Sequence, residues 1–244
     1  MSSTYGYKYN DIAFQSTGAD LSLQSMKPFA SLISLVFHPL LILTYMLVLM
    51  LVVNPYVFGY NRISDAHTLI LMVALTSALI PVIAILVMKG IGWVRTLEMS
   101  DRHERIGPYL VTAVLYLSLY LHLVKAKSFP APLLIATLGA VLALFAGFFL
   151  NNFRKISMHA IGVGGFLTLT VILYVSFTTD QFVLPVPFLL DILTPTIVIV
   201  YVAILVAGLV CSARLISGTH TPAEVYVGFF TGVLSMLVAC LVLA

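Results

Sequence analysis

Three residues able to do chemistry stand close together near the end of the chain: Arg214, His220 and Glu224. Arginine binds anions, histidine transfers protons or attacks electrophiles, and a carboxylate can orient a histidine. Long apolar runs lie on both sides of the three, at residues 196–210 and 225–244. Ionisable side chains beside a bilayer are costly, so their presence here indicates a functional site.

The same stretch also has a structural interpretation. Thr221-Pro222-Ala223-Glu224 has the form Thr-x-x-Glu with proline at the first helical position, which predicts a helix start with Thr221 as its N-cap. Arg214 would then only anchor the preceding helix at the membrane interface. A cap gives no role to His220 or Arg214, however, and their spacing matches a catalytic motif.

The pattern Arg-x5-His-x3-Glu, preceded by Ser212, resembles the third signature of the type 2 phosphatidic acid phosphatase superfamily, Ser-Arg-x5-His-x3-Asp. The chain differs from that signature in two ways: its serine lies one place early, and glutamate replaces aspartate. The resemblance implies that His220 attacks phosphorus, that Glu224 orients His220, and that Arg214 holds phosphate oxygens.

A second polar cluster, residues 151–159, ends in Ile156-Ser157-Met158-His159. This resembles the superfamily's Pro-Ser-Gly-His signature without its proline and glycine. Ser157 suits the N-cap of a following helix, whose free backbone N–H groups favour an anion. The resemblance implies that His159 protonates the leaving oxygen as a general acid and that Ser157 adds a hydrogen bond. The structural alternative is a capped helix with a histidine at headgroup level.

The densest polar stretch, residues 95–105, fits the superfamily's first signature, Lys-x6-Arg-Pro, least well. Arg105 is followed by Ile-Gly-Pro but has no lysine seven positions before it. Arg95 and Arg102 have the correct interval but lack the proline. The stretch therefore allows two alignments to the signature.

Arg102 and Arg105 are three residues apart, so they share a face if this stretch is helical. Two guanidinium groups on one face can hold phosphate oxygens bidentately. We therefore favour these two as phosphate-binding residues, with Arg95 in reserve, and expect Asp101 and Glu104 to hold the arginines in position. The alternative is a solvated charge cluster at the membrane surface.

The composition is that of an integral membrane protein. Hydrophobic residues make up 61% of the 244 positions and charged residues 9%, and the mean hydropathy is +1.11. That balance excludes a water-soluble domain. The net charge of +3 is dispersed, which argues against nucleic acid as a partner. Cys211 and Cys240 lie in apolar runs, so neither a disulfide framework nor a zinc site is expected.

We expect a polar tail at residues 1–27 and one membrane domain at residues 28–244, folded as an all-α polytopic helical bundle. It would have about seven transmembrane helices: a phosphatase-like core of six and one more. His38, near the start of the first run, is a possible site residue, or else bonds to a neighbouring helix. The apolar, proline-bearing loop at 180–194 is expected to be partly re-entrant. The runs cover residues 29–53, 68–88, 108–123, 133–150, 159–178, 196–210 and 222–244.

The order of the spans places the three polar clusters at one membrane surface. Two spans lie between the first and second clusters and two more between the second and third. An even number of crossings returns the chain to the same side.

The orientation of this side in the membrane is a separate question. Its lysines and arginines favour the cytoplasm, but four of the nine are suspected site residues. Members of the superfamily commonly face the periplasm or lumen. We follow the resemblance and expect a non-cytoplasmic site, in the inner membrane of the cell if the source is bacterial.

The three altered signatures together cover roughly residues 95–230. They imply a membrane phosphatase that hydrolyses a lipid phosphate or diphosphate through a phosphohistidine. Polyprenyl phosphate, phosphatidic acid and phosphatidylglycerol phosphate all fit. No metal or cofactor is expected, because three arginines supply the positive charge. A lipid phosphotransferase and a non-catalytic protein that binds or transports lipid headgroups are the alternatives, and the patterns leave the oligomeric state open.

Overall fold

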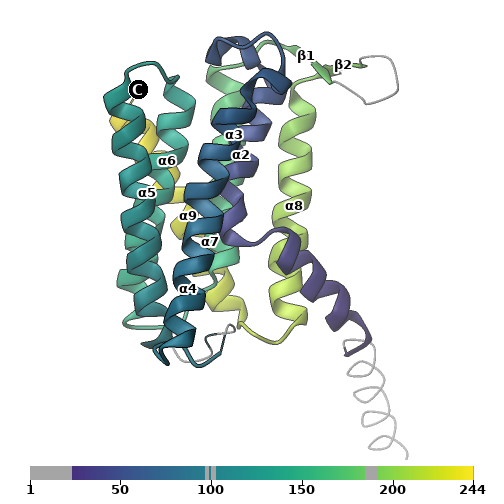
Figure 1. Ribbon diagram of the computed structural model, residues 1–244. Coiled ribbons are helices and arrows are strands. Elements are labelled where there is room, and N and C mark those ends of the chain that lie inside the picture. Colours follow the sequence, from purple (N-terminus) through teal and green to yellow (C-terminus); the bar gives the residue numbers. More distant parts are fainter. Residues whose placement is uncertain (1–23, 97–98, 100–102, 185–191, 244) are drawn as a thin grey trace, which may run out of the picture.

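The computed structural model describes residues 24–96, 99, 103–184 and 192–243. These residues form an all-α bundle whose long helices run up and down beside one another (Figure 1). Six of the described helices are long and apolar enough to cross a membrane, or seven if one bent pair counts as a single span. The expected polytopic helical bundle is therefore confirmed.

The long helices are joined by short 3-10 and π-helical segments and by one hairpin. The first described helix is Gln24–Val36. It is followed in chain order by α2 (Pro39–Val53), two 3-10 turns (Pro55–Phe58 and Ile63–Ala66), α3 (His67–Ala74), a π-helical turn (Leu75–Leu79), α4 (Ile80–Gly90), a 3-10 turn (His103–Arg105), α5 (Ile106–Ala126), α6 (Ala131–Asn151), α7 (Met158–Ser176), β1 (Gln181–Leu184), β2 (Ile192–Pro195), α8 (Ile197–Ile216) and α9 (Pro222–Leu243).

The composition of the first apolar run suggested one continuous helix, but the structure shows two helices. The helix Gln24–Val36 and α2 meet at an angle of 59°. His38 between them is extended, with φ −63° and ψ 138°. Pro39 explains the break, because proline disfavours the helical conformation at the residue before it and has no N–H to donate. The break turns His38 into the N-cap of α2 and sends the preceding helix away from the bundle axis (Figure 1).

The two ends of the segment expected to be partly re-entrant are paired strands. β1 and β2 pair antiparallel, with Gln181 opposite Pro195, and they project from the end of the bundle opposite the N-terminal helix (Figure 1). Residues 185–191 lie outside the described part of the chain.

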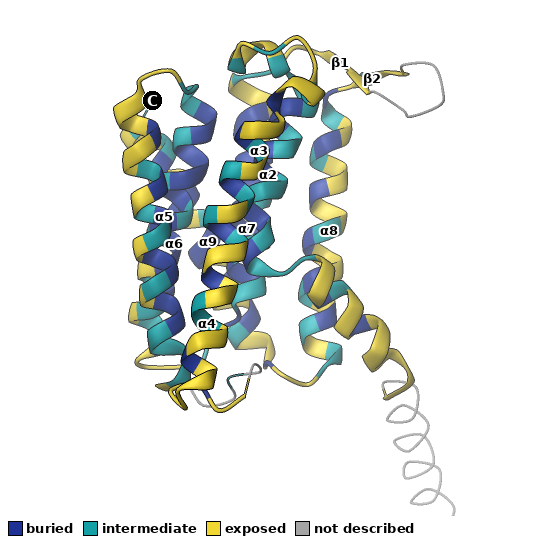
Figure 2. Ribbon diagram, viewed as in Figure 1, coloured by how far each residue is buried: buried dark blue, intermediate teal, exposed yellow. Residues whose placement is uncertain are grey.

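Burial follows the helix faces that look toward the bundle axis (Figure 2). The core is made chiefly of leucine, isoleucine and methionine side chains from α2, α5, α6, α7 and α9. The outward faces carry large exposed hydrophobic side chains such as Val175, Leu205 and Leu241. In a membrane these faces contact lipid, which explains why exposed and buried positions are equally apolar.

Glycines let α7 and α9 approach closely. A Cβ atom at Gly228 would lie 2.6 Å from the carbonyl oxygen of Ser157, and one at Gly232 would collide with the carbonyl of Ile161. The backbone N–H of Ser157 also donates to the carbonyl of Glu224 at 3.3 Å. The starts of α7 and α9 are therefore fixed against each other, and these are the starts that carry the second and third polar clusters.

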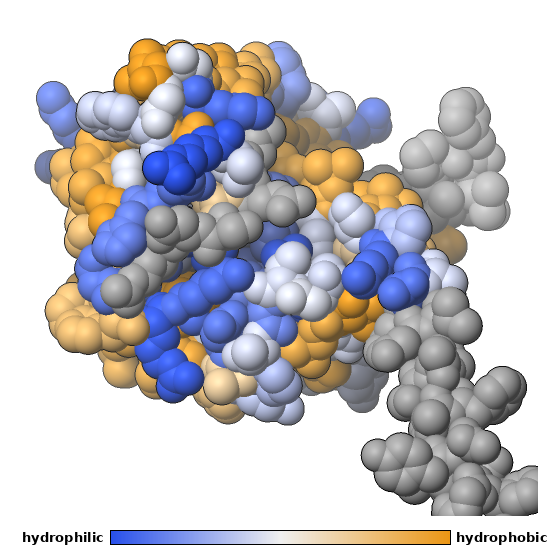
Figure 3. Space-filling view, turned by 90° about the horizontal axis from the view of Figure 1, so that it is seen from below, coloured by the Kyte–Doolittle hydropathy of each residue, from blue (hydrophilic) through white to orange (hydrophobic). Residues whose placement is uncertain are grey.

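The polar clusters meet at one end of the bundle, as the count of spans predicted. α5, α7 and α9 start at this end, and α8 finishes there (Figure 1). Seen from this end, hydrophilic residues gather toward the middle of the face and hydrophobic residues lie along much of its border (Figure 3).

Candidate active site

A cavity of about 180 Å³ lies within the bundle near its polar end. Five residues singled out from the sequence line it together: His38, Arg105, His159, Arg214 and His220. They come from the break before α2, the start of α5, the start of α7, the end of α8 and the turn before α9. Residues separated by up to 182 positions thus share one chamber.

His220 and Glu224 form a close side-chain pair at this cavity. Nδ1 of His220 lies 2.8 Å from Oε2 of Glu224, and the two side chains are only 3% and 19% exposed. Because a carboxylate only accepts, Nδ1 carries the hydrogen and Nε2 keeps its lone pair in the neutral imidazole. The arrangement therefore leaves Nε2 as the nucleophilic nitrogen of His220.

Glu224 also closes the capping box, so both interpretations of this stretch hold at once. The N–H of Thr221 donates to Oε2 of Glu224 at 3.4 Å, and the N–H of Glu224 donates to Oγ1 of Thr221 at 3.4 Å. Both capping contacts are longer than the contact to His220. The cap fixes the carboxylate at the helix start, and the carboxylate in turn fixes the imidazole.

Burial lowers the pKa of His220 to about 4, against the raising effect of the bond to Glu224. The cations Arg214, Lys155 and Arg105 lower that pKa further. His220 is therefore neutral at pH 7, the form in which Nε2 can attack an electrophile.

Arg105 is held by backbone carbonyls. Its Nε donates to Met99 at 2.8 Å, and its Nη1 donates to Ile156 at 3.3 Å. Among the described residues, no partner bonds to its Nη2. Two anchoring bonds and a free edge of the guanidinium are what a preorganised anion-binding arginine needs.

The rest of the first polar cluster is placed differently from the expectation. Arg95 is 87% exposed on its side chain and pairs with Glu104 at 3.9 Å, so it stays outside the cavity. Glu104 therefore holds Arg95, and we find no bond from it to Arg105 among the described residues. Arg102 and Asp101, the other two residues proposed for this cluster, lie outside the described part of the chain.

Arg214 and His159 share a partner that the sequence did not reveal. Nη1 of Arg214 donates to the hydroxyl of Ser34 at 3.1 Å, while Nε2 of His159 donates to the carbonyl of Ser34 at 3.0 Å. The carbonyl can only accept, so Nε2 of His159 carries a hydrogen. Nδ1 is then the nitrogen of His159 left to exchange a proton. The Nε atom of Arg214 is buried without a bonding partner among the described residues.

His38 belongs to the same chamber. Its Nδ1 accepts from the N–H of Leu40 at 3.4 Å, and its ring lies 5.7 Å from the ring of His159 in an edge-to-face arrangement. With Nδ1 accepting, Nε2 of His38 carries the hydrogen. His38 therefore offers a neutral N–H donor.

Ser157 does not line the cavity. It is fully buried, and its hydroxyl accepts from the N–H of Ala160 at 3.4 Å, which makes it the N-cap of α7. The structure thus favours the capping interpretation of this serine over a direct bond to phosphate. Through the backbone bond to Glu224, Ser157 still positions the two helix starts.

Two more polar residues that no motif marked lie at the site. Lys155 donates to the carbonyl of Thr219 at 2.8 Å, beside His220, and burial together with Arg105 lowers its pKa. Tyr109, one helical turn after Arg105, lines the cavity with a buried hydroxyl. Lys155 was visible only as part of a polar segment, and Tyr109 only as one aromatic among many in an apolar run.

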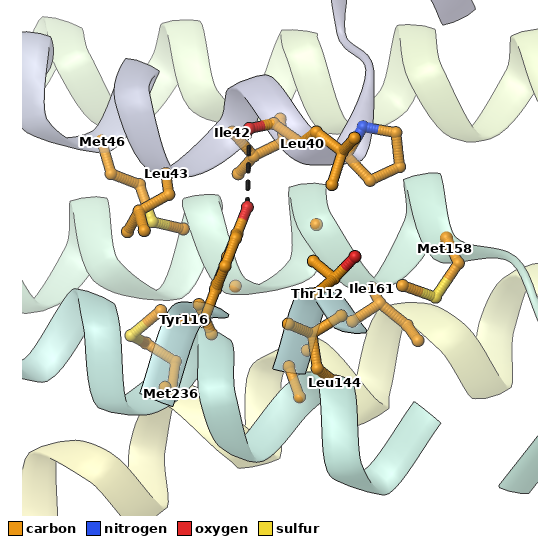
Figure 4. Close-up of a pocket in the computed structure, with 17 residues that line it drawn as sticks. Leu40, Ile42, Leu43, Met46, Thr112, Tyr116, Leu144, Met158, Ile161 and Met236 are labelled. Atoms are coloured by element: carbon orange, nitrogen blue, oxygen red, sulfur yellow. Dashed lines mark hydrogen bonds between the residues drawn. The ribbon is translucent and has the colours of Figure 1, made fainter. Parts of the chain in front are cut away.

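A second, smaller cavity of about 60 Å³, drawn in Figure 4, shares part of its lining with the first. No charged side chain is found in its lining among the residues that the structure describes, and the hydroxyl of Tyr116 reaches across it toward the carbonyl of Leu40 at 3.5 Å (Figure 4). Of the two cavities, only the larger one can hold an anion. The residues that line both are Pro39, Leu40, Thr112, Leu144 and Met158.

Fold and site together define a multi-pass helical membrane protein with a buried histidine–carboxylate pair and two arginines at one end of the bundle. Comparison of the chain with family models, curated proteins and solved structures finds no match. Among the described residues, no group of three or more His, Cys, Asp or Glu side chains is placed to hold a metal ion.

Proposed function

We propose that this protein is a membrane phosphatase that hydrolyses a lipid phosphate or diphosphate through a phosphohistidine on His220. The observation that carries the proposal is the 2.8 Å contact between His220 and Glu224 in a cavity that Arg105 and Arg214 also line. A histidine with an orienting carboxylate is an activated nucleophile, and paired arginines are the usual ligands of phosphoryl oxygens. The three altered signatures of the phosphatidic acid phosphatase superfamily add the same roles by resemblance.

The balance of donors and acceptors in the cavity supports an anionic ligand. Among the described residues, its lining includes Arg105 and Arg214 and no carboxylate, and Glu224 behind it is already bonded to His220. A buried guanidinium without a counter-charge is unfavourable, so a phosphate group would satisfy both the charge and the free N–H groups. Lys155 adds a third positive charge beside the pair.

The geometry allows a balanced double displacement. Nε2 of His220 forms a bond to phosphorus while the bond from phosphorus to the lipid oxygen breaks, and the leaving oxygen takes the Nδ1 proton of a protonated His159. Glu224 stabilises the positive imidazole of the phosphohistidine through Nδ1–H. Water then attacks phosphorus and gives its proton to Nδ1 of His159, which returns both histidines to their starting states. Arg105 and Arg214 neutralise the charge on the phosphoryl oxygens in both steps.

The location of the cavity suggests a lipid substrate. It lies among helices with lipid-facing apolar surfaces, at the end of the bundle where the polar clusters meet. An amphiphile can place its headgroup at that level while its hydrocarbon part stays in the bilayer. Polyprenyl phosphate, phosphatidic acid and phosphatidylglycerol phosphate share the group that the site would recognise.

Phosphate release from these three lipids by purified protein in detergent tests the proposal. We expect wild type to release phosphate from at least one of them and His220→Ala to release none. His122→Ala is a matched control, because this histidine is exposed near the far end of α5. Transfer of phosphate to an added alcohol instead of water would indicate a phosphotransferase. Binding of lipid without any release would indicate a headgroup-binding protein and would contradict the proposal.

A further inference from the structure

Two tyrosines on α5 have the same burial but different bonding. Tyr109 and Tyr116 lie seven residues apart, so they occupy nearly the same face of the helix, and each is 4% exposed. The hydroxyl of Tyr116 donates to the carbonyl of Ser77 at 3.0 Å. The hydroxyl of Tyr109 has no hydrogen-bond partner among the described residues. Buried hydroxyl groups are normally bonded, so the one on Tyr109 requires an explanation.

Packing explains the ring of Tyr109 but not its hydroxyl. The ring lies against Gly147 of α6, where an added Cβ atom would come within 3.1 Å of Cε1 and 3.7 Å of the hydroxyl oxygen. Phenylalanine would fill this space equally well without placing a polar atom in it. A tyrosine is therefore unfavourable for the fold of the protein alone.

The hydroxyl belongs to the cavity of the candidate site. Tyr109 lines that cavity together with Arg105, one helical turn earlier, and with His220. Among the described residues of the lining, the other buried donor that lacks a bonding partner is Nε of Arg214. Both donors line one chamber, so an acceptor bound there can reach donors that the protein itself leaves unbonded.

We propose that the hydroxyl of Tyr109 is a binding residue for the headgroup, donating its hydrogen to an oxygen of the bound phosphate ester. This rests on the proposed function, which supplies the ligand. One helical turn advances about 5.4 Å along the axis, so Tyr109 meets the ligand deeper in the bundle than Arg105 does. Its bond adds a neutral donor to the charged contacts of the arginines, and no proton is transferred from it.

Matched phenylalanine variants of the two tyrosines test this role. In Tyr109→Phe we expect the thermal midpoint of the ligand-free protein to stay the same or rise, because an unsatisfied hydroxyl is removed. We expect its affinity for a lipid phosphate to fall about tenfold or more, as for a lost bond to a charged group. In Tyr116→Phe we expect the reverse: a lower midpoint, because the carbonyl of Ser77 loses its donor, and unchanged affinity.

Binding is measured in the His220→Ala background, where turnover cannot consume the probe. The probes are dioctanoyl phosphatidic acid, farnesyl phosphate and inorganic phosphate. Weaker binding of all three in Tyr109→Phe places the acceptor among the phosphoryl oxygens, and weaker binding of the two esters alone places it at the ester oxygen. Both results support the role.

Equal affinity of Tyr109→Phe and its parent for every probe that the parent binds, or a lower thermal midpoint without ligand, would overturn it. A parent that binds none of the three probes would overturn it as well, because the role requires a bound phosphate. Failure of the Tyr109 role can be distinguished from failure of the proposed function. A wild type that binds lipid phosphate through Tyr109 but releases no phosphate contradicts only the hydrolysis. A wild type that releases phosphate while Tyr109→Phe binds normally contradicts only the role of Tyr109.

Discussion

The imidazole of His220 and the carboxylate of Glu224 lie 2.8 Å apart, one helical turn from each other, across the start of α9. The cap that begins the helix and the pair that would perform the chemistry use the same carboxylate oxygen. Glu224 thus has a structural role and a proposed catalytic role, and substitutions can separate the two.

Glu224→Gln separates the cap from the orientation of His220. An amide can still accept at the third helical position, so the free energy of unfolding should change by roughly 1 kcal/mol or less. The same change removes the charge that stabilises a cationic His220, and comparable orienting carboxylates cost about four orders of magnitude in rate when they are neutralised. We expect kcat for phosphate release to fall by about that factor, and Glu224→Asp to retain partial activity.

Thr221→Ala is the control for this comparison, because it removes the capping hydroxyl and leaves the carboxylate. It should lose a similar amount of stability, measured by thermal unfolding in detergent, and keep its kcat. A Glu224→Gln protein with full activity would show that the carboxylate is structural only.

The pH dependence of kcat/KM should report the low pKa of His220 in the free protein. Only neutral His220 can attack, so kcat/KM should rise with pH through about 4, and it should fall again at the pH where His159 loses the proton that it gives to the leaving oxygen. Lys155 lowers this pKa, so Lys155→Met should move the acid limb to higher pH. Glu224 raises it, so Glu224→Gln should move the limb to lower pH. The same substrate is used for all three proteins, so the ionisation of the substrate cancels in the comparison. Acid limbs that coincide in wild type and both variants would exclude His220 as the titrating group.

The sequence predicted well those features that depend on run length and order. Apolar runs near the length of a bilayer specify helices, and counting them placed three distant clusters at one end of the bundle. The break at His38 was also encoded, since Pro39 disfavours a helical residue before it, but the continuous apolar run concealed it.

Contacts across the bundle made by residues outside any sequence motif could not be predicted from run length and order. Ser34 bonds to residues 125 and 180 positions away, and Tyr109 differs from other aromatics only by what surrounds its hydroxyl. Neither has a local pattern, because their partners are set by how the helices pack. The resemblance placed Ser157 at the phosphate, whereas its position before an apolar run predicted the N-cap that its hydroxyl forms.

Arg105→Lys tests whether the guanidinium holds phosphate oxygens. Lysine keeps the charge but loses the planar fork, with its anchors to the carbonyls of Met99 and Ile156. We expect kcat/KM to fall by about a hundredfold, as for one lost bidentate contact to an anion. Arg95→Lys is the matched control, because its side chain is 87% exposed, and it should behave as wild type. Normal activity of Arg105→Lys together with impaired Arg95→Lys would favour the other alignment of the first signature.

Ser34→Ala tests whether the N-terminal helix takes part in the site. The substitution removes the hydroxyl that accepts from Nη1 of Arg214 and keeps the backbone carbonyl that accepts from His159. Arg214 would then be less well fixed, so we expect KM for a lipid phosphate to rise about three- to tenfold, while kcat, which depends on His159, changes less.

Alanine is a better helix former than serine, so the helix itself should not be weakened. Ser31→Ala is the matched control, because Ser31 lies on the same helix but is exposed. Steady-state kinetics on the two variants decide the matter. Equal KM in both would show that Ser34 only ties the helix to the bundle, and a fall in kcat with unchanged KM would mean that the hydroxyl acts on the chemical step instead of on Arg214.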